Sequence, residues 1–131
     1  MAPTVPTGRL QLRLEPVPTA PAAVRRRLSD ELPGWGVGPD ALDAALMVST
    51  ELVTNAVEHA RTALELTVEP DGTDIVISVR DSSPSDPCLQ PHRVLARRGR
   101  GLQMVAALAR QWAWTAHPDG KTVWARVPVD T

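Results

Sequence analysis

The sequence predicts an α+β domain: a two-layer α/β sandwich in which a mixed, mostly antiparallel sheet of about five strands is covered on one face by three helices. Three observations support this prediction. Short segments alternate apolar and polar residues, as half-buried strands do, and longer segments repeat apolar residues at helical spacing. Two pairs of strand-like segments are joined by short connectors that contain Asp-Gly, a hairpin signal. The length of 131 residues suits one domain with one core.

The N-terminal part of the chain predicts one strand followed by one helix. Residues 1–8 are rich in Pro and Thr and are expected to be a flexible segment, so that the folded domain spans residues 9–129. Leucine alternates with polar residues over 10–14, which is the period of a strand, and a helix is expected over about 20–32. The residues of this helix that we expect to face the core are Ala23, Val24, Leu28 and Leu32.

A long helix is expected from about Asp40 to Ala60, which at the usual rise per residue spans roughly 30 Å. Pro39 suits the first helical position, and Asp40 and Asp43 fall in the first turns, where acidic residues complement the helix dipole. Its broad apolar face comprises Leu42, Ala45, Leu46, Val48, Leu52, Val53, Ala56 and Val57. Such a face is typical of a helix that packs against a sheet.

The rest of the chain predicts two hairpins separated by a long loop and a short helix. The expected elements are strands over 63–68 and 74–80, a Pro-containing loop over 82–98, a helix from Leu102 to about Gln111, and strands near 112–116 and 122–127. In the second strand, Ile75, Ile77 and Val79 would face one side of the sheet, with Val76 and Ser78 on the other. A loop as long as 82–98 in a compact domain is usually functional or mobile.

Composition and charge argue against some classes of function. The net charge of −1 disfavours a nucleic-acid-binding protein, which usually carries a basic excess, so no direct nucleic-acid partner is expected. No apolar run approaches the ~20 residues needed to cross a bilayer, and the N-terminus has no hydrophobic signal segment. We therefore expect a cytoplasmic protein that is not attached to a membrane.

Three polar residues near the end of the long helix, Glu51, Asn55 and His59, are spaced four apart and would form one stripe. The Asn55 carboxamide could ligate Mg²⁺, which takes few protein atoms and completes its shell with phosphates and water. Glu51, one turn earlier, could act as a general base toward an attacking hydroxyl or water. His59 could lie near a phosphate or pack against the sheet. The alternative is that the stripe is simply the solvated face of an amphipathic helix.

Asp81 stands where an apolar strand gives way to the loop. A carboxylate at this place can accept a hydrogen bond from an amine, such as the exocyclic amino group of adenine. The alternative is an Asp that caps the turn through its own backbone, which is common in turns.

A turn of Gly99, Arg100 and Gly101 precedes the short helix. Helix N-termini present unpaired N–H groups, and glycines let the backbone approach a phosphate closely. Arg97 and Arg98 add positive charge beside the turn. A single Gly-x-Gly also marks ordinary turns, so this feature gains weight only together with the other two.

Four segments occur in an order that resembles a known family: ELVTNAVEHA over 51–60, VRDSSP over 79–84, GRGLQMV over 99–105 and GKTVWA over 120–125. The sequence resembles the histidine-kinase-like (Bergerat-fold) ATP-binding superfamily, and within it the small stand-alone anti-sigma-factor serine/threonine kinases. The resemblance covers about residues 8–129. It implies the Bergerat ATP-binding fold, with ATP and Mg²⁺ as cofactors.

The resemblance also implies roles for individual positions. Glu51 would be the catalytic base, Asn55 the Mg²⁺ ligand and Asp81 the partner of the adenine amino group. The residues expected to contact the bound nucleotide are Asn55, His59, Asp81, Ser83, Arg98, Gly99, Arg100, Gly101, Leu102 and Thr122. The loop over 82–98 would be a lid, residues 99–102 would form its phosphate-side end, and Thr122 would lie near the adenine.

The function implied by the resemblance is an ATP-dependent protein serine/threonine kinase that phosphorylates an anti-sigma-factor antagonist and sequesters a sigma factor, with homodimerisation as a further expectation. One departure favours an alternative. The segment after Asp81 reads Ser82-Ser83-Pro84, without the glycine that the family has there. A non-catalytic, nucleotide-responsive module that sequesters a protein partner, or a sequestering domain that has lost ATP binding, therefore also fits the sequence.

Overall fold

The computed structural model describes residues 8–83 and 101–129. The elements in chain order are β1 (Leu10–Leu14), α1 (Ala20–Glu31), the 3-10 turn η1 (Leu32–Trp35), α2 (Pro39–Asn55), the π turn η2 (Ala56–Ala60), β2 (Leu64–Asp71), β3 (Asp74–Asp81), α4 (Gly101–Leu108), β4 (Gln111–His117) and β5 (Gly120–Pro128). The predicted flexible segment 1–8, apart from Gly8, lies outside the described residues, as does the predicted lid 82–98 apart from Ser82 and Ser83.

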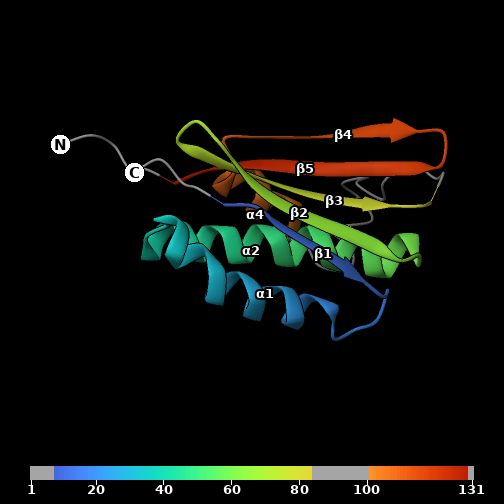
Figure 1. Ribbon diagram of the computed structural model, residues 1–131. Helices are drawn as coiled ribbons and strands as arrows, with labels where there is room; N and C mark the ends of the chain where they lie inside the picture. Colours follow the sequence, from blue (N-terminus) through green and yellow to red (C-terminus); the bar gives the residue numbers. More distant parts are fainter. Residues whose placement is uncertain (1–7, 84–100, 130–131) are drawn as a thin grey trace.

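The strands form one sheet in the order β1-β2-β3-β5-β4, and every neighbouring pair among the described strands is antiparallel. The helices α1, α2 and α4 lie along one face of this sheet, and α2 packs against α1, α4, β3 and β5 (Figure 1). The predicted fold class is therefore confirmed: an α+β sandwich with three helices on one face of a five-stranded sheet. No parallel pair occurs among the described strands, so the sheet is not mixed there.

The core lies between the sheet and α2. The inward-facing positions of β2 and β3 alternate with half-buried or exposed ones, as the period of a strand requires. The core residues of these two strands are Leu64, Leu66, Val68, Ile75, Ile77 and Val79, and α2 contributes Ala45, Val48, Leu52 and Val53. Fully burying a large apolar side chain contributes about 1.5–3 kcal/mol, so this layer is the main source of stability.

Three details of the sequence prediction are wrong. Ala23 is exposed, and the buried positions of α1 are Ala20, Val24 and Leu28, which follow one line at four-residue spacing. The first hairpin is tighter than expected because Pro70 and Asp71 pair with β3, and Gly72 at φ 66° takes the left-handed conformation of the turn. Lastly, α4 ends at Leu108 rather than near Gln111.

The early end of α4 has a direct cause in the sheet. The backbone N–H of Arg110 donates to the carbonyl of Arg126 at 2.7 Å, and Gln111 pairs with Arg126 in the β4–β5 ladder. These residues complete their hydrogen bonds in the strand rather than in another helical turn. The second predicted hairpin is confirmed, and His117 pairs with Gly120 at its end.

Candidate functional site

The C-terminal half of α2 carries the first two predicted site residues. The helix is regular through Asn55, so Glu51 and Asn55 lie one turn apart. Both side chains are half-buried, and within the described part of the chain neither makes a side-chain hydrogen bond or ion pair. An amide oxygen and a carboxylate that have no side-chain partner among the described residues could each contact a ligand.

His59 does not continue this stripe in the expected way. It lies in the π turn η2, which the N–H of Arg61 closes by donating to the carbonyl of Ala56 at 3.2 Å. A π turn is wider than an α turn, so four-residue spacing no longer stacks His59 directly over Asn55. Arg61 then ends the turn in the left-handed conformation, at φ 58°. Turns of this kind inside helices are frequent at functional sites.

Glu51 also borders an open groove between α1 and α2, the α1–α2 groove. Its volume is about 470 Å³, within the usual range for ligand sites. The lining residues are Arg25, Asp43, Leu46, Met47, Thr50 and Glu51. Neither Asn55 nor Asp81 belongs to this lining, so Glu51 lies at the border of the groove on the helix that also carries Asn55.

The end of β3 presents Asp81 as a buried carboxylate, with only 3% of the residue exposed. The backbone N–H of Ser83 donates to Asp81 Oδ1 at 2.8 Å, so the turn-capping interaction considered from the sequence is present. In addition, Lys121 Nζ lies 3.1 Å from each carboxylate oxygen, and Lys121 is 6% exposed. A turn-capping Asp does not need a buried lysine beside it. Asp and Lys side chains are almost never buried unless they are paired, so Asp81 has a second role as the partner of Lys121.

The segment that follows α2 is in contact with the end of β3. The π turn η2 packs against β3, and the backbone N–H of Ser82 donates to Thr62 Oγ1 at 3.0 Å, just beyond that turn. In Figure 1 the C-terminal ends of η2 and β3 lie at the same end of the sandwich. The fold thus brings Asn55, the last residue of α2, and Asp81 to one end of the domain.

Gly120 holds β5 against this end of β3. A Cβ placed on Gly120 would lie 2.0 Å from the backbone oxygen of Asp81, and the φ of Gly120 is +157°. Only glycine permits this approach. The resulting register pairs Asp81 with Lys121, which places both side chains on the helix-covered face of the sheet.

Thr122 does not lie beside Asp81. Successive residues of a strand point to opposite faces, so Thr122 lies on the face opposite Lys121, where its Oγ1 is 2.8 Å from His117 Nε2. Its predicted role near adenine stays a prediction. The residue that sequence reasoning missed is Lys121. The sequence contained a signal for its burial. Val123, Ala125 and Val127 are core positions of β5, and Lys121 lies two residues before Val123 and therefore on the same face of the strand.

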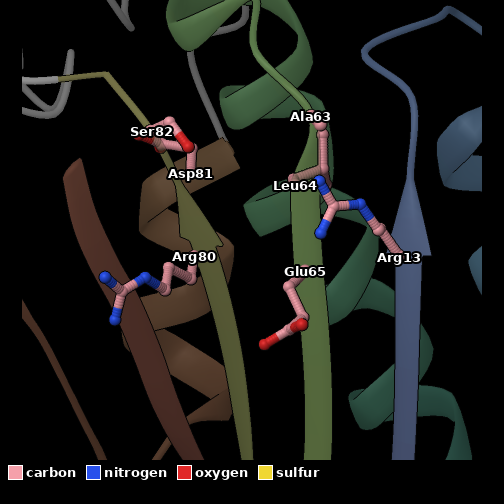
Figure 2. Close-up of a pocket in the computed structure, with 7 residues that line it drawn as sticks. All are labelled: Arg13, Ala63, Leu64, Glu65, Arg80, Asp81 and Ser82. Atoms are coloured by element: carbon pink, nitrogen blue, oxygen red, sulfur yellow. The ribbon is translucent and has the colours of Figure 1, made fainter. Parts of the chain in front are cut away.

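A second, smaller hollow lies at the ends of β1, β2 and β3, and its volume is about 140 Å³. Figure 2 shows the Arg13 guanidinium over the start of β2 and the Glu65 carboxylate between β2 and β3, while Arg80 extends away toward β5. Arg80 donates to Asp119 at 3.0 Å. Because sites for drug-sized ligands usually exceed about 300 Å³, we assign no nucleotide to this hollow.

The remaining predicted positions fall in the predicted lid, in the predicted turn that follows it and at the start of α4. Arg98, Gly99 and Arg100 lie outside the described residues. Gly101 and Leu102 begin α4, which Val105 anchors in the core. Among the described residues, no group of three or more His, Cys, Asp or Glu side chains could hold a metal ion. Within the same residues, no helix has the length and apolar character needed to span a membrane.

The antiparallel sheet with three helices on one face, with the end of α2 and the buried Asp81 at one end of the sandwich, has the architecture of an ATPase domain of the histidine-kinase type. Residues 14–127 match the family model of the histidine kinase-like ATPase domain, and the chain belongs to this family. The predicted histidine-kinase-like ATP-binding superfamily is therefore confirmed.

Among solved structures, the chain is similar to the crystal structure of the RsbU and RsbW domains of Rv1364c from Mycobacterium tuberculosis, with a TM-score of 0.68 and 22% sequence identity. The similarity covers 96% of this chain and 34% of that chain, so this chain spans about a third of the length of the chain it matches. At this identity the likeness concerns the fold. The search of curated proteins found no match.

Proposed function

We propose that this domain binds Mg-ATP and transfers the γ-phosphoryl group to a serine or threonine of an anti-sigma-factor antagonist. The observation that carries the proposal is the pair Glu51 and Asn55, one turn apart and uncommitted within the described residues, on the helix whose end is tied to Asp81. Membership of the ATPase family supports ATP as the nucleotide.

Glu51 is the proposed general base. In the transfer, the acceptor hydroxyl oxygen forms a bond to the γ-phosphorus, the bond from that phosphorus to the β–γ bridging oxygen breaks, and ADP leaves. Glu51 takes the hydroxyl proton. The carboxylate borders the open α1–α2 groove, where Met47 is 37% exposed, and this supports a protein side chain rather than a buried small molecule as the acceptor.

Asn55 is the proposed ligand of Mg²⁺. The donor set fits this ion, because Mg²⁺ usually takes one or two protein oxygens and completes its shell with phosphates and water. The Asn55 carboxamide is half-buried and has no hydrogen-bond partner among the described residues. When bound, the ion neutralises charge on the phosphates.

Asp81 is the proposed partner of the adenine amino group. It is buried at the end of β3 and held in place by Ser83 and Lys121. We propose that the predicted lid, with Arg98, Gly99, Arg100, Gly101 and Leu102, completes the phosphate side of the site. His59 and Ser83 are proposed to lie around the nucleotide, whereas Thr122 lies on the opposite face of the sheet from Asp81 and is not included in this proposal.

The proposed kinase function also implies where the protein acts and which proteins it binds. We propose that the protein is cytoplasmic, regulates transcription by binding a sigma factor, and acts as a homodimer. The named RsbW domain of the similar structure supports the regulatory class.

The test uses radiolabelled ATP and a candidate antagonist protein with the full chain. We expect phosphoserine or phosphothreonine in the antagonist. Glu51→Ala should abolish transfer while ATP binding, measured by calorimetry, stays within about twofold of wild type. Asn55→Ala should weaken Mg-ATP binding itself. Transfer that survives Glu51→Ala at the wild-type rate would remove Glu51 as the base.

A second candidate function is supported by the segment after Asp81. The N–H of Ser83, at a position near the glycine expected in the family, is bound to the Asp81 carboxylate rather than open to a ligand. In this alternative, the domain binds nucleotide and responds to it by exposing or hiding a partner surface, without phosphoryl transfer. Mg-ATP binding together with no transfer to any antagonist tested would favour it. An absence of binding heat would instead favour a domain that sequesters proteins without nucleotide.

A further inference from the structure

Lys121 is a buried charge that the proposed function does not use. It is the chain's single lysine, and the residue is 6% exposed although its strand lies next to the edge strand β4. Its ammonium lies 3.1 Å from both oxygens of Asp81, so the two residues form a closed ion pair on the helix-covered face. An ion pair at this depth is weak evidence for stability, because desolvating both charges offsets much of their attraction.

The contacts of Asp81 leave its two oxygens unequal. Oδ1 accepts from the backbone N–H of Ser83 and from Lys121, while Oδ2 has only the Lys121 contact among the described residues. Each carboxylate oxygen has two acceptor positions. Oδ2 therefore retains one position for a further donor, in an orientation set by Ser83 and Lys121.

We infer that Lys121 is a specificity-determining residue that makes the site select a purine with a 6-amino group over one with a 6-oxo group. The inference rests on the proposed function, because it requires a purine nucleotide at Asp81. As the anion of a buried ion pair, Asp81 offers acceptors only. For a base whose 6-substituent faces Oδ2, a 6-amino group donates to the open position, whereas a 6-oxo group in the same orientation brings a second oxygen against it. A site built to form a specific hydrogen bond strongly rejects an analogue that lacks the hydrogen-bonding group.

Removal of the ammonium is expected to end this selectivity. A buried carboxylate without a counter-charge is neutralised by taking up a proton. A protonated Asp81 has an O–H that can donate to a 6-oxo group, so both classes of purine find a partner. The selectivity thus resides in the charge of Lys121, which acts through Asp81 and need not touch the base.

The experiment is calorimetric titration of the full chain with Mg-ATP and with Mg-ITP, whose base carries a 6-oxo group and an N1–H in place of the 6-amino group and the bare N1 of adenine. Wild type should bind ATP at least about 100-fold more tightly than ITP. Lys121→Met should reduce this ratio to less than about fivefold, mainly through tighter ITP binding, and Lys121→Arg should preserve it because the charge remains. Arg126→Met is the matched control, since it removes an ion pair with Asp71 and Asp74 at the other end of β5 and should leave the ratio unchanged.

A second variant covers the case in which Lys121→Met does not fold. Lys121→Gln keeps an amide donor for Asp81 but removes the charge, and it should lose the ratio as well. If wild type binds ATP but shows no preference over ITP, or if both neutral variants keep the preference, the role of Lys121 is refuted while nucleotide binding stands. Tighter ATP binding by Lys121→Met with an unchanged ratio would also refute it, because Lys121 would then compete with the base. Wild type that binds neither nucleotide overturns the proposed function itself.

Discussion

The Asp81–Lys121 pair offers the sharpest test of the structure, because breaking it should cost far more than breaking an exposed pair. Lys121→Met leaves the Asp81 carboxylate, 3% exposed, without its counter-charge. Loss of one partner of a buried ion pair costs about 3–5 kcal/mol of unfolding free energy. Asp81→Asn leaves the ammonium in the same situation and should have a cost of similar size.

The double variant Asp81→Asn/Lys121→Met carries neither charge. Because replacing a buried pair as a whole is often nearly neutral, it should be no less stable than either single variant, with a coupling of about 3 kcal/mol between the two positions. The matched control is Arg27 with Glu31, an i,i+4 pair on α1 at 2.7 Å whose side chains are 47% and 32% exposed. Its coupling should be about 0.3–0.5 kcal/mol.

The assay is urea unfolding followed by fluorescence of the four tryptophans, with the slope of the transition compared among all variants. A change in midpoint at constant slope reports stability. If Lys121→Met costs less than about 1 kcal/mol, or if the two positions show no coupling, the ammonium reaches solvent. The buried pair, and the specificity role inferred from it, would then be wrong.

Three further predictions concern the framework of the site. Gly120→Ala should destabilise the protein by about 2–4 kcal/mol, because its Cβ would lie 2.0 Å from the backbone oxygen of Asp81. Urea unfolding measures this loss of stability. A cost below about 1 kcal/mol would contradict the register of β3 and β5. Leu66→Ala should cost about 2–5 kcal/mol, since Leu66 is 0% exposed between the sheet and the helices; thermal unfolding with Leu12→Ala as a half-buried control should show the larger loss at Leu66. Thr62→Val removes the acceptor of the Ser82 N–H and should cost about 0.5–1.5 kcal/mol of unfolding free energy. Hydrogen exchange of the Ser82 amide should become faster. Unchanged exchange would show that the bond to Thr62 does not protect this amide.

Periodicity made the elements of this fold predictable. The alternation of Ile75, Ile77 and Val79 and the helical spacing along α2 are local properties of the chain. The structure buries the three strand residues and most of the predicted helix face, while Leu42, Leu46 and Val57 are half-buried. The position of Asp81 at a strand end and the one-turn spacing of Glu51 and Asn55 were readable for the same reason. Ala23 was predicted wrongly because an alanine adds little apolar area, and its neighbours decided which line of α1 faces inward.

The sequence by itself determined which segments become strands and helices, and which of them carry polar residues at their ends, because both depend on spacing along the chain. Only the tertiary structure decided the partners of those residues. The pairing of Asp81 with Lys121 depends on the close approach of Gly120 to β3, across 40 residues of chain, and the tie from Ser82 to Thr62 depends on how the π turn meets the sheet. Such contacts are set by the register and packing of segments distant in sequence, so no local pattern contains them.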